Sequence, residues 1–450
     1  LDRSSAASDV YKRQVIRLSG PLTENIIKST FRRGKELKKI DEIVERTLYY
    51  GFIVDPEKEE IIDEVTLLFY RAPRSYTGED MAEVISHGGL IIPEKIKNIF
   101  IKMGARLAER GEFTRRAFIN GKIDLIKAEA IVDIISAQSE IAYRCALNNL
   151  QGKLSDRFNK IKENLMEVMA DIEAVIDFDE DVPDMDMESI NQRLKEIKER
   201  IEDMISNYEK SRFLMEGLKV VIAGKPNVGK SSLLNRLLDR DRAIVTDIPG
   251  TTRDTIEETL SIEGMFFKVI DTAGIRRTDD PVERLGVERS IEKLRESDLV
   301  IFVMDASENI TEEDKFILEL LEKFKKRTII VLNKIDKGIN ICETLLPKNL
   351  TKIKISAKTG EGIEELKSFI KNIIAEVENI DYYINERHYN CLLRARYFLD
   401  RAIKSIKENS MLDMVSVEIR EVIKSLEEIT GEITTEDILN LIFSKFCIGK

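Results

Sequence analysis

A single stretch near the middle of the chain, Gly224–Ser231, constrains the fold more than any other. Its residues fit the pattern G-x-x-x-x-G-K-[ST], in which glycines let backbone N–H groups surround a β-phosphate. The apolar run Leu218–Ala223 predicts a buried strand before it, and Ser232–Leu238 predicts an amphipathic helix after it, whose N-terminal dipole favours phosphate. The alternative, an ordinary glycine-rich turn, does not require a strand before it and a helix after it. The pattern therefore predicts the phosphate-binding loop (P-loop) of a nucleoside triphosphatase.

Two side chains of the P-loop have specific predicted roles. Lys230 is expected to reach the β- and γ-phosphate oxygens, and the Ser231 hydroxyl is expected to bind Mg²⁺. The predicted nucleotide contacts from this region are Asn227, Val228, Gly229, Lys230, Ser231 and Ser232.

Two segments downstream are suited to sensing the γ-phosphate. Thr246–Asp254 lies within reach as a mobile switch loop, and Thr252 is predicted to complete the Mg²⁺ shell. Asp271 follows the apolar run Phe266–Ile270 and is predicted to hold Mg²⁺ through water, while the Gly274 N–H faces the γ-phosphate. The predicted contacts here are Thr246, Asp247, Ile248, Pro249, Gly250, Thr251, Thr252, Asp271, Thr272, Ala273 and Gly274.

Two further segments predict which base is bound. The Asp336 carboxylate can accept hydrogen bonds from the N1–H and 2-amino groups of guanine, and adenine offers neither donor, so GTP is selected over ATP. Each segment alone could be an ordinary loop at a strand end, but five in order after successive strands could not. The residues predicted to form the base pocket are Asn333, Lys334, Ile335, Asp336, Ser356, Ala357 and Lys358.

These motifs predict a doubly wound α/β sheet, from about Gly217 to Val377, that binds its ligand at the carboxyl ends of the strands. The fold class predicted for the chain is this α/β P-loop GTPase domain inserted into a discontinuous all-α helical domain, preceded by a small α+β domain. The predicted domains are residues 15–118 (α+β), 119–216 (helical, first part), 217–377 (nucleotide-binding) and 378–450 (helical, second part). The two insertion ends, near Ser211 and Val377, are expected to lie close together.

Composition agrees with this organisation. A chain of 450 residues suggests about three domains, and 43% hydrophobic residues with only 9 prolines suit a folded, helix-rich protein. No apolar run reaches about 18 residues, so no membrane span is expected, and no secretion signal pattern is seen, so a cytoplasmic location is expected. The four cysteines are scattered without a C-x-x-C pair, which indicates neither a disulfide framework nor a zinc site.

Charge and helical periodicity add local expectations. The net charge of −11 argues against general nucleic-acid binding. The segment Glu94–Lys127 nevertheless holds nine basic and four acidic residues, which indicates either a solvated basic face or a binding patch. Gly152 is expected to separate two long helices. His87 is more readily explained as structural than as catalytic, since no Cys or acid lies at metal-ligand spacing. Leu1–Gln14 has no apolar period and is expected to be non-native and poorly ordered.

Beyond the nucleotide motifs, several segments resemble the bacterial tRNA-modifying GTPase family called MnmE or TrmE. The residues that carry the resemblance are Ile16–Gly20, Ser75–Asp80, His87–Gly89, Gly111–Phe118, Asn120–Lys122, Gly250–Asp254 and Phe446–Lys450. The resemblance implies a homodimer formed through the N-terminal domain, a bound 5-formyl-tetrahydrofolate or related tetrahydrofolate, and a flavin-dependent partner, MnmG (GidA). The pair would install an aminomethyl-type group at carbon five of the wobble uridine of certain tRNAs.

The resemblance also assigns residues. Arg17, Glu83, Lys122 and Lys450 would line the folate pocket, where Arg and Lys suit folate carboxylates and Glu suits pterin N–H groups. Cys447, in the terminal Cys-x-Gly-Lys motif, is either a functional residue or a small buried apolar one. Family members usually open with a Pro- and Gly-containing strand where Leu1–Gln14 stands here, so that first strand is expected to be absent.

The mechanism of GTP hydrolysis is expected to be unusual. Ile275 occupies the position where many small GTPases carry a water-orienting Gln. The resemblance implies instead that a K⁺ ion offsets developing charge when two nucleotide domains meet, held by Asn227, Thr246, Ile248 and Thr251. Asn227 could alternatively only stabilise its loop. Glu283 would position the catalytic water, or would be a first-turn helix acid at a favourable dipole.

Two other functional classes fit the nucleotide motifs. A ribosome-assembly or RNA-chaperone GTPase would bind RNA without modification chemistry, and would predict a KH-type module with a G-x-x-G loop, which the sequence does not offer. A scaffold protein would use hydrolysis only to time assembly. The terminal Cys-x-Gly-Lys motif argues against both.

Overall fold

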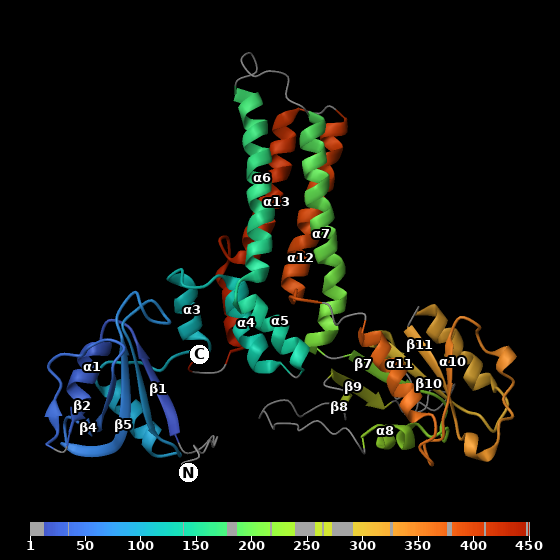
Figure 1. The fold of residues 1–450 in the computed structure, drawn as a ribbon, viewed down its shortest axis with the longest axis horizontal. Helices are drawn as coiled ribbons and strands as arrows, with labels where there is room; N and C mark the ends of the chain where they lie inside the picture. The colour runs from blue at the N-terminus through green and yellow to red at the C-terminus, as the bar shows by residue number, and fades with distance from the viewer. Residues whose placement is uncertain are drawn as a thin grey trace, which may run out of the picture. The chain divides into compact units, whose positions relative to one another are not determined.

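The chain is described here by a computed structural model, which covers residues 13–34, 36–137, 139–177, 187–216, 218–238, 257–262, 265–271, 291–324, 327–375, 380–408, 411–446 and 449 (Figure 1). It divides into two compact units. The first contains Leu1–Val132, Leu150–Glu163 and Ile423–Lys450, and the second contains Asp133–Asn149 and Asn164–Val422. None of the described helices is long and apolar enough to cross a membrane.

The first unit is built on a six-stranded antiparallel sheet with the strand order β1-β6-β5-β4-β2-β3. Its apolar residues alternate, as in Val65, Leu67 and Phe69 of β5, so one face of the sheet is buried. Helices α1 and α2 cover that face with Ile26, Ile96 and neighbouring side chains. The elements are β1 (Arg13–Ser19), α1 (Thr23–Thr30), β2 (Phe31–Arg33), β3 (Lys38–Lys39), β4 (Leu48–Asp55), β5 (Glu60–Tyr70), β6 (Met81–His87), α2 (Ile92–Lys102) and α3 (Glu112–Ile119).

The start of β1 corrects one expectation. Arg13 and Gln14 pair with His87 and Ser86, so the prediction that Leu1–Gln14 is poorly ordered is wrong for these two residues. They have no apolar pattern because they belong to an edge strand, which is held by backbone hydrogen bonds on one side and is exposed on the other. Residues 1–12 lie outside the described part of the chain.

The helical elements are α4 (Leu125–Ser136), α5 (Glu140–Leu150), α6 (Lys153–Asp177), α7 (Met187–Glu216), α12 (Glu386–Lys407), α13 (Leu412–Thr430) and α14 (Glu436–Ser444). Gly152, at φ +94°, separates α5 from α6 as predicted. The break between α4 and α5 was not predicted. It is fixed by Ser139, whose Oγ accepts a hydrogen bond from the Ala142 N–H at 3.1 Å and so caps α5.

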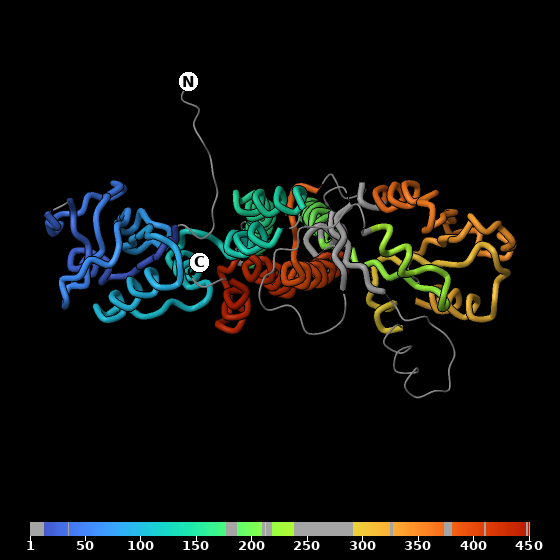
Figure 2. The backbone as a smooth tube through the Cα atoms, turned by 90° about the horizontal axis from the view of Figure 1, so that it is seen from below, coloured from blue at the N-terminus to red at the C-terminus, as the bar shows by residue number. Residues whose placement is uncertain are grey.

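Within the second unit, α6, α7, α12 and α13 form a bundle (Figures 1 and 2). Ion pairs join each helix to its neighbours, and Tyr208 of α7 stacks on Tyr389 of α12 with ring centroids 4.1 Å apart. The ion pairs are Arg193–Asp171 between α7 and α6, Lys198–Asp400 between α7 and α12, Arg401–Glu418 between α12 and α13, and Arg420–Glu173 between α13 and α6. Apolar residues at helical spacing are buried in each of these helices, as Leu165, Leu194 and Leu399 illustrate.

The nucleotide-binding part of the second unit is a six-stranded sheet with the order β12-β11-β10-β7-β9-β8. All its pairings are parallel except that between β8 and β9. Adjacent residues of β7, Val220 and Val221, belong to different apolar clusters, so helices cover both faces and the predicted doubly wound sheet is confirmed. The elements are β7 (Leu218–Ala223), α8 (Lys230–Leu238), β8 (Glu257–Ile262), β9 (Met265–Asp271), β10 (Leu299–Asp305), α10 (Glu312–Lys323), β11 (Arg327–Asn333), η1 (Ile335–Lys337), η2 (Glu343–Leu345), β12 (Thr351–Lys354) and α11 (Ile363–Ala375).

Strand β10 was not anticipated, although every residue in it is buried. It lies between β7 and β11 at the centre of the sheet. Because prediction of the sheet relied on strands that end in a nucleotide motif, β10 and the antiparallel edge strand β8 were left out. Strand β10 is important for the nucleotide site because it pairs directly with β7, the strand that leads into the P-loop.

The chain enters and leaves the nucleotide-binding part at neighbouring positions. Asn207 Nδ2 of α7 donates to Tyr382 Oη at 3.1 Å, and Asn149 Nδ2 of α5 donates to the Tyr383 carbonyl at 2.8 Å. Residues just outside both predicted insertion ends are therefore in contact, as an inserted domain requires. Val377 itself lies outside the described residues.

Candidate functional site

The P-loop connects β7 to α8 as the sequence predicted, and its backbone permits no larger residue at two positions. Gly224 has φ +152°, and a Cβ there would lie 2.4 Å from the Val303 carbonyl oxygen. Gly229 has φ +97°, and a Cβ there would lie 2.3 Å from Asn333 Nδ2. Both glycines are therefore required by close approach as well as by conformation.

Lys230, at the start of α8, is buried and points back over the loop. Its Nζ donates to the carbonyl oxygens of Gly224 at 3.0 Å and Lys225 at 2.9 Å. A positive charge is thereby placed at a helix N-terminus, where backbone N–H groups also favour an anion. This is the arrangement expected of a phosphate site.

A cavity of ≈ 550 Å³ lies beside the P-loop at the carboxyl ends of β11 and β12. The structure brings together most of the residues predicted for the base pocket, and adds Asn235, Arg236 and Lys337. The lining residues are Gly229, Ser232, Asn235, Arg236, Asn333, Lys334, Asp336, Lys337, Ala357 and Lys358.

Asn333 joins the base pocket to the P-loop. Its side chain is buried, its Nδ2 donates to the Val228 carbonyl at 2.8 Å, and its Oδ1 accepts from the Ala357 N–H at 3.0 Å. Asn333 therefore fixes the spacing of the two loops between which a base would lie.

Asp336 is the acceptor that the sequence predicted for guanine. Its Oδ1 accepts a hydrogen bond from Ser356 Oγ at 2.7 Å. That bond holds the pKa of Asp336 below its ordinary value, with smaller contributions from Lys358 and Lys337. The carboxylate is therefore oriented and stays ionised, as an acceptor for guanine N–H groups requires.

Lys334 crosses from the base pocket to the top of the P-loop. Its Nζ donates to the Asn227 carbonyl at 2.6 Å and to Asp305 Oδ2 at 2.7 Å. Asp305 ends β10 and is buried. Burial alone would raise the pKa of Asp305, but hydrogen bonds from Lys334 and Ser307 bring it below its ordinary value. Asp305 was not predicted from the sequence, where its one local signal is an acid directly after an apolar run.

Two other basic residues were also missed. Lys225, inside the P-loop, contacts Glu308 at 2.9 Å and the buried Asp314 at 3.6 Å. Burial works to lower its pKa, but these carboxylates raise it overall. Arg236 Nε donates to the Ala357 carbonyl at 3.1 Å, and its Nη2 donates to the Lys358 carbonyl. Arg236 thus fixes the outer wall of the base pocket from α8.

Several predicted nucleotide-site residues lie outside the described part of the chain: Thr246, Asp247, Ile248, Pro249, Gly250, Thr251, Thr252, Thr272, Ala273, Gly274, Ile275 and Glu283. The backbone of Asp271 is described, and it pairs with Ile222 at the carboxyl end of β9. This places Asp271 beside the strand that leads into the P-loop. Among the described residues, no group of three or more His, Cys, Asp or Glu could hold a metal ion.

The first unit contains a second cavity, of ≈ 790 Å³, along β1 and α2. Arg17 and Gly449 both line it, and Arg17 Nη1 donates to the Gly449 carbonyl at 3.0 Å. Arg17 Nε also pairs with Glu83 Oε1 at 2.8 Å. Two of the residues implied for a folate pocket are thus adjacent, and the C-terminal motif reaches them. Lys450 and Cys447 lie outside the described residues.

Glu83 and Lys122, the other described residues of that set, do not line this cavity. Lys122 Nζ donates to the Pro73 carbonyl at 2.9 Å, in the loop after β5. The expectation that Lys122 shares one pocket with Arg17 is therefore not met in this arrangement.

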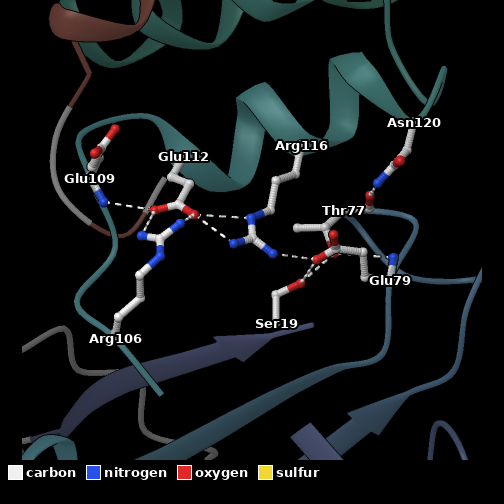
Figure 3. A network of polar contacts seen from close by, with 8 residues as sticks. All are labelled: Ser19, Thr77, Glu79, Arg106, Glu109, Glu112, Arg116 and Asn120. Carbon is white, nitrogen blue, oxygen red and sulfur yellow. Dashed lines mark hydrogen bonds and ion pairs between the residues drawn. The ribbon is translucent and has the colours of Figure 1, made fainter. Parts of the chain in front are cut away.

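Four motif segments of the first unit, Ile16–Gly20, Ser75–Asp80, Gly111–Phe118 and Asn120–Lys122, meet in one polar network (Figure 3). Arg116 lies at its centre, donating to Glu79 Oε2 at 2.7 Å and to Glu112 Oε1 at 2.6 Å. Ser19 Oγ also donates to Glu79 at 2.9 Å, and Asn120 Nδ2 donates to the Thr77 carbonyl at 2.7 Å. These contacts give a physical reason for motif residues that periodicity could not explain.

Glu112 is the most strongly perturbed group of this network. Burial works to raise its pKa, but hydrogen bonds from Arg106, the Glu109 N–H and Arg116 lower it from 4.5 to about 2. Elsewhere in Glu94–Lys127, several other basic residues also form ion pairs, as in Arg115–Glu436 and Lys127–Asp124. Pairing of this extent favours a structural role for the basic segment over a binding patch.

A doubly wound sheet with a P-loop, and a base pocket whose acceptor suits guanine, define a P-loop GTPase class of protein. Two family models match the chain. The MnmE helical domain model matches residues 125–447, and the model for the N-terminus of the GTP-binding protein TrmE matches residues 4–122. The second range includes residues 4–14, most of the segment Leu1–Gln14 that was expected to be non-native.

Full-length relatives agree with these matches. The tRNA modification GTPase MnmE of Aquifex aeolicus is 44% identical over 447 residues, covering 97% of this chain and 96% of the relative. The protein of the same name from Thermotoga sp. strain RQ2 is 44% identical over 444 residues, with the same coverage. A solved structure of Aquifex aeolicus Era is 29% identical over 40% of this chain and 66% of that chain, with a TM-score of 0.29, which is too low to bear on the assignment. The chain belongs to the MnmE (TrmE) family of tRNA modification GTPases.

Proposed function

We propose that this chain hydrolyses GTP and, with a flavin-dependent partner, modifies carbon five of the wobble uridine of tRNAs. The observation that carries the proposal is the base pocket, in which Ser356 orients the Asp336 carboxylate and Asn333 ties the pocket to the P-loop. A guanine-specific acceptor fixed relative to a phosphate-binding loop is what a GTPase needs. Membership of the MnmE family supports the coupling to tRNA modification.

The residues present fit GTP with Mg²⁺. Lys230, which begins α8, would contact the β- and γ-phosphates. The hydroxyl of Ser231, the next residue, would hold Mg²⁺ together with Thr252 and, through water, Asp271. When bound, Mg²⁺ neutralises charge on the phosphate oxygens. The chain's own contribution is to orient the nucleotide between the P-loop and the pocket around Asp336.

Asn227 is the residue through which K⁺ activation is proposed. It has φ +64°, a left-handed conformation that is uncommon outside glycine, and its carbonyl is held by Lys334. Asn227 is thus fixed at the top of the loop, and would contribute to a K⁺ site with Thr246, Ile248 and Thr251. A cation there would supply the charge that an arginine finger supplies in other GTPases. Glu283 is proposed to position the attacking water.

The cavity beside Arg17 is proposed to bind a tetrahydrofolate. Its lining combines the apolar side chains of Leu18, Leu22 and Phe100 with Arg17 and Arg116, which suits an aromatic ring system carrying carboxylates. Glu83, held by Arg17, and Lys450 complete the proposed set. Titration of the purified full chain with 5-formyl-tetrahydrofolate should show saturable binding that Arg17→Ala weakens, and equal binding by both proteins would remove this part of the proposal.

A homodimer formed through the N-terminal domain is also proposed. Strand β1 is an edge strand of its sheet, and Val15 on it is 52% exposed. Edge strands with exposed apolar residues are places where a second chain can pair. Sedimentation of the full chain tests this, with Val15→Lys as the variant expected to weaken association.

The experiment that tests the whole function is wobble-nucleoside analysis. In a strain lacking this gene, tRNAs should lose the modified wobble uridine, and restoring the wild-type gene but not an Asp336→Ala variant should recover it. Retention of the modification in the deletion strain would favour the alternative of a ribosome-assembly or RNA-chaperone GTPase.

A further inference from the structure

We propose that Asp305 is a positioning residue for the P-loop, which controls nucleotide affinity by fixing Lys334 against the carbonyl of Asn227. The inference rests on the proposed binding of guanine nucleotides. It goes beyond it in assigning a role to a residue at the end of β10, a strand that carries no nucleotide motif.

The Asp305 carboxylate is itself held in place. It is buried with its side chain 4% exposed, and its Oδ1 accepts hydrogen bonds from the Ser307 N–H at 3.0 Å and Ser307 Oγ at 2.6 Å. The other oxygen, Oδ2, accepts from Lys334 Nζ at 2.7 Å. With one oxygen anchored to the backbone, the second has a defined position for the lysine.

Lys334 needs such an anchor because its side chain is long and flexible. Its ammonium joins two groups, Asp305 Oδ2 and the Asn227 carbonyl, the latter at 2.6 Å. Without the carboxylate, only the hydrogen bond to the Asn227 carbonyl would offset the side-chain entropy lost by holding the ammonium over the P-loop. The contact with Asn227 therefore depends on Asp305.

Both residues of this contact have a left-handed backbone conformation, which is unfavourable for residues other than glycine. Asn227 has φ +64° and Lys334 has φ +65°, and left-handed residues other than glycine persist when their surroundings hold them. The hydrogen bond from Lys334 to Asn227 links the two directly. Loosening it allows the P-loop to leave the conformation in which its N–H groups surround phosphate.

The same strand braces the P-loop at two other points. The Val303 carbonyl of β10 approaches Gly224 so closely that a Cβ would not fit, and Glu308, just after β10, pairs with Lys225 at 2.9 Å. Three residues of the P-loop are therefore contacted from this side: Gly224 by β10, Lys225 by the turn after β10, and Asn227 by Lys334, which Asp305 holds.

The opposite end of β10 offers a matched control. Asp298 precedes the strand, its side chain is 10% exposed, and it accepts from Arg212 Nη2 at 2.6 Å and from the Lys219 N–H at 3.0 Å. Like Asp305, it is a carboxylate with one ion pair and one backbone hydrogen bond. It makes these contacts away from the P-loop.

The test compares GDP binding and thermal unfolding of the full chain for wild type, Asp305→Asn and Asp298→Asn. Asp305→Asn should weaken GDP binding about tenfold or more, the effect of losing a charge-assisted hydrogen bond, while Asp298→Asn stays within about twofold at a similar loss of melting temperature. Equal GDP affinities for the two variants would overturn the inference. Wild-type protein that fails to bind GDP would instead overturn the proposed function.

A double-mutant cycle separates positioning from general destabilisation. If Asp305 acts through Lys334, then Lys334→Met should already remove the contribution of Asp305 to GDP affinity. Adding Asp305→Asn to that variant should then weaken GDP binding little further. Additive losses would contradict the inference. If Asp305→Asn does not fold, Ser307→Ala tests the inference instead. Removing the hydroxyl that anchors Asp305 should weaken GDP binding about threefold. Unchanged GDP binding would contradict the positioning role of Asp305.

Discussion

The two candidate sites of this chain are built in opposite ways. In the nucleotide site, each main functional residue lies at the carboxyl end of a parallel strand: the P-loop follows β7, Asn333 ends β11, and Ser356 follows β12. In the N-terminal domain, residues from separate motifs mostly contact one another, with Arg116 bridging Glu79 and Glu112 (Figure 3). In the first arrangement the sheet fixes where each polar group lies, whereas in the second the polar groups fix one another.

The difference shows when the chemistry of a site can be inferred from a sequence motif alone. A motif at a strand end has a position fixed by the sheet, so its chemistry follows from its residues. A motif whose side chains neutralise one another reports how the domain is held together, and the ligand is then recognised by the cavity beside it.

The guanine acceptor should be the most sensitive point of the molecule. Asp336→Asn replaces an acceptor by a donor facing guanine N1–H, so GTP affinity should fall by a factor of about 10⁴. Because xanthine carries a carbonyl where guanine carries its 2-amino group, the variant should bind xanthosine triphosphate better than GTP. Nucleotide competition with the full chain measures both.

Glu343→Gln is the control for that experiment. Glu343 lies in the same part of the chain and pairs with the exposed Lys354, so its loss should leave GTP affinity within about twofold. If Asp336→Asn kept its preference for GTP, the base pocket would have to be formed by other residues.

Glu283→Ala should lower kcat for GTP hydrolysis by about a thousandfold, the range for a group that positions or polarises the attacking water. GTP affinity should change little, because such a group acts in the transition state. Single-turnover hydrolysis and equilibrium binding separate the two. Parallel losses in turnover and affinity would assign Glu283 a structural role instead.

Exchange of K⁺ for Na⁺ should lower kcat about a hundredfold, comparable with removal of one electrostatic donor from an active site. Hydrolysis by the full chain is measured at constant ionic strength and Mg²⁺. Asn227→Ala should abolish the difference between the two cations. Equal rates in K⁺ and Na⁺ for the wild-type chain would exclude the cation site.

Much of the nucleotide site could be predicted because its signals are local. The P-loop, the Asp336 acceptor and the strands before them are each encoded within a few residues. An acid directly after the apolar run Leu299–Met304 was the one local sign of Asp305. Its role could not be predicted from that sign, since it depends on β10 lying between β7 and β11. The helix break at Ser139 was missed because the apolar period continues across it and only one hydroxyl marks the cap.

The N-terminal site was predictable only through family resemblance. Arg17 and Glu83 are adjacent because β1 and β6 pair in one register, and pairing between strands so distant in the sequence is not encoded locally. Arg13 and Gln14 were misjudged for a related reason, since an exposed edge strand needs no apolar pattern. Internal ion pairs such as Arg116–Glu79 were likewise invisible before the fold was known.

The smallest effect is expected from a substitution in the polar network, and it changes the free energy of unfolding of the N-terminal domain. Glu112 is held ionised by Arg106, the Glu109 N–H and Arg116, which lower its pKa from 4.5 to about 2. A carboxyl with a depressed folded-state pKa stabilises the fold above its unfolded pKa, and that stability is lost as the pH falls from 4.5 towards 2. Glu112→Gln should therefore destabilise the N-terminal domain by about 1–3 kcal/mol at pH 7.

Urea unfolding of the full chain at pH 7 and at several values below 4.5 measures this effect. The stability difference between wild type and Glu112→Gln should shrink across that acidic range, because wild-type Glu112 becomes protonated there. Glu109→Gln is the matched control, since Glu109 is exposed and contributes only its backbone N–H to the network. A difference that stayed constant with pH would mean that shape, and not the charge on Glu112, holds these motif segments together.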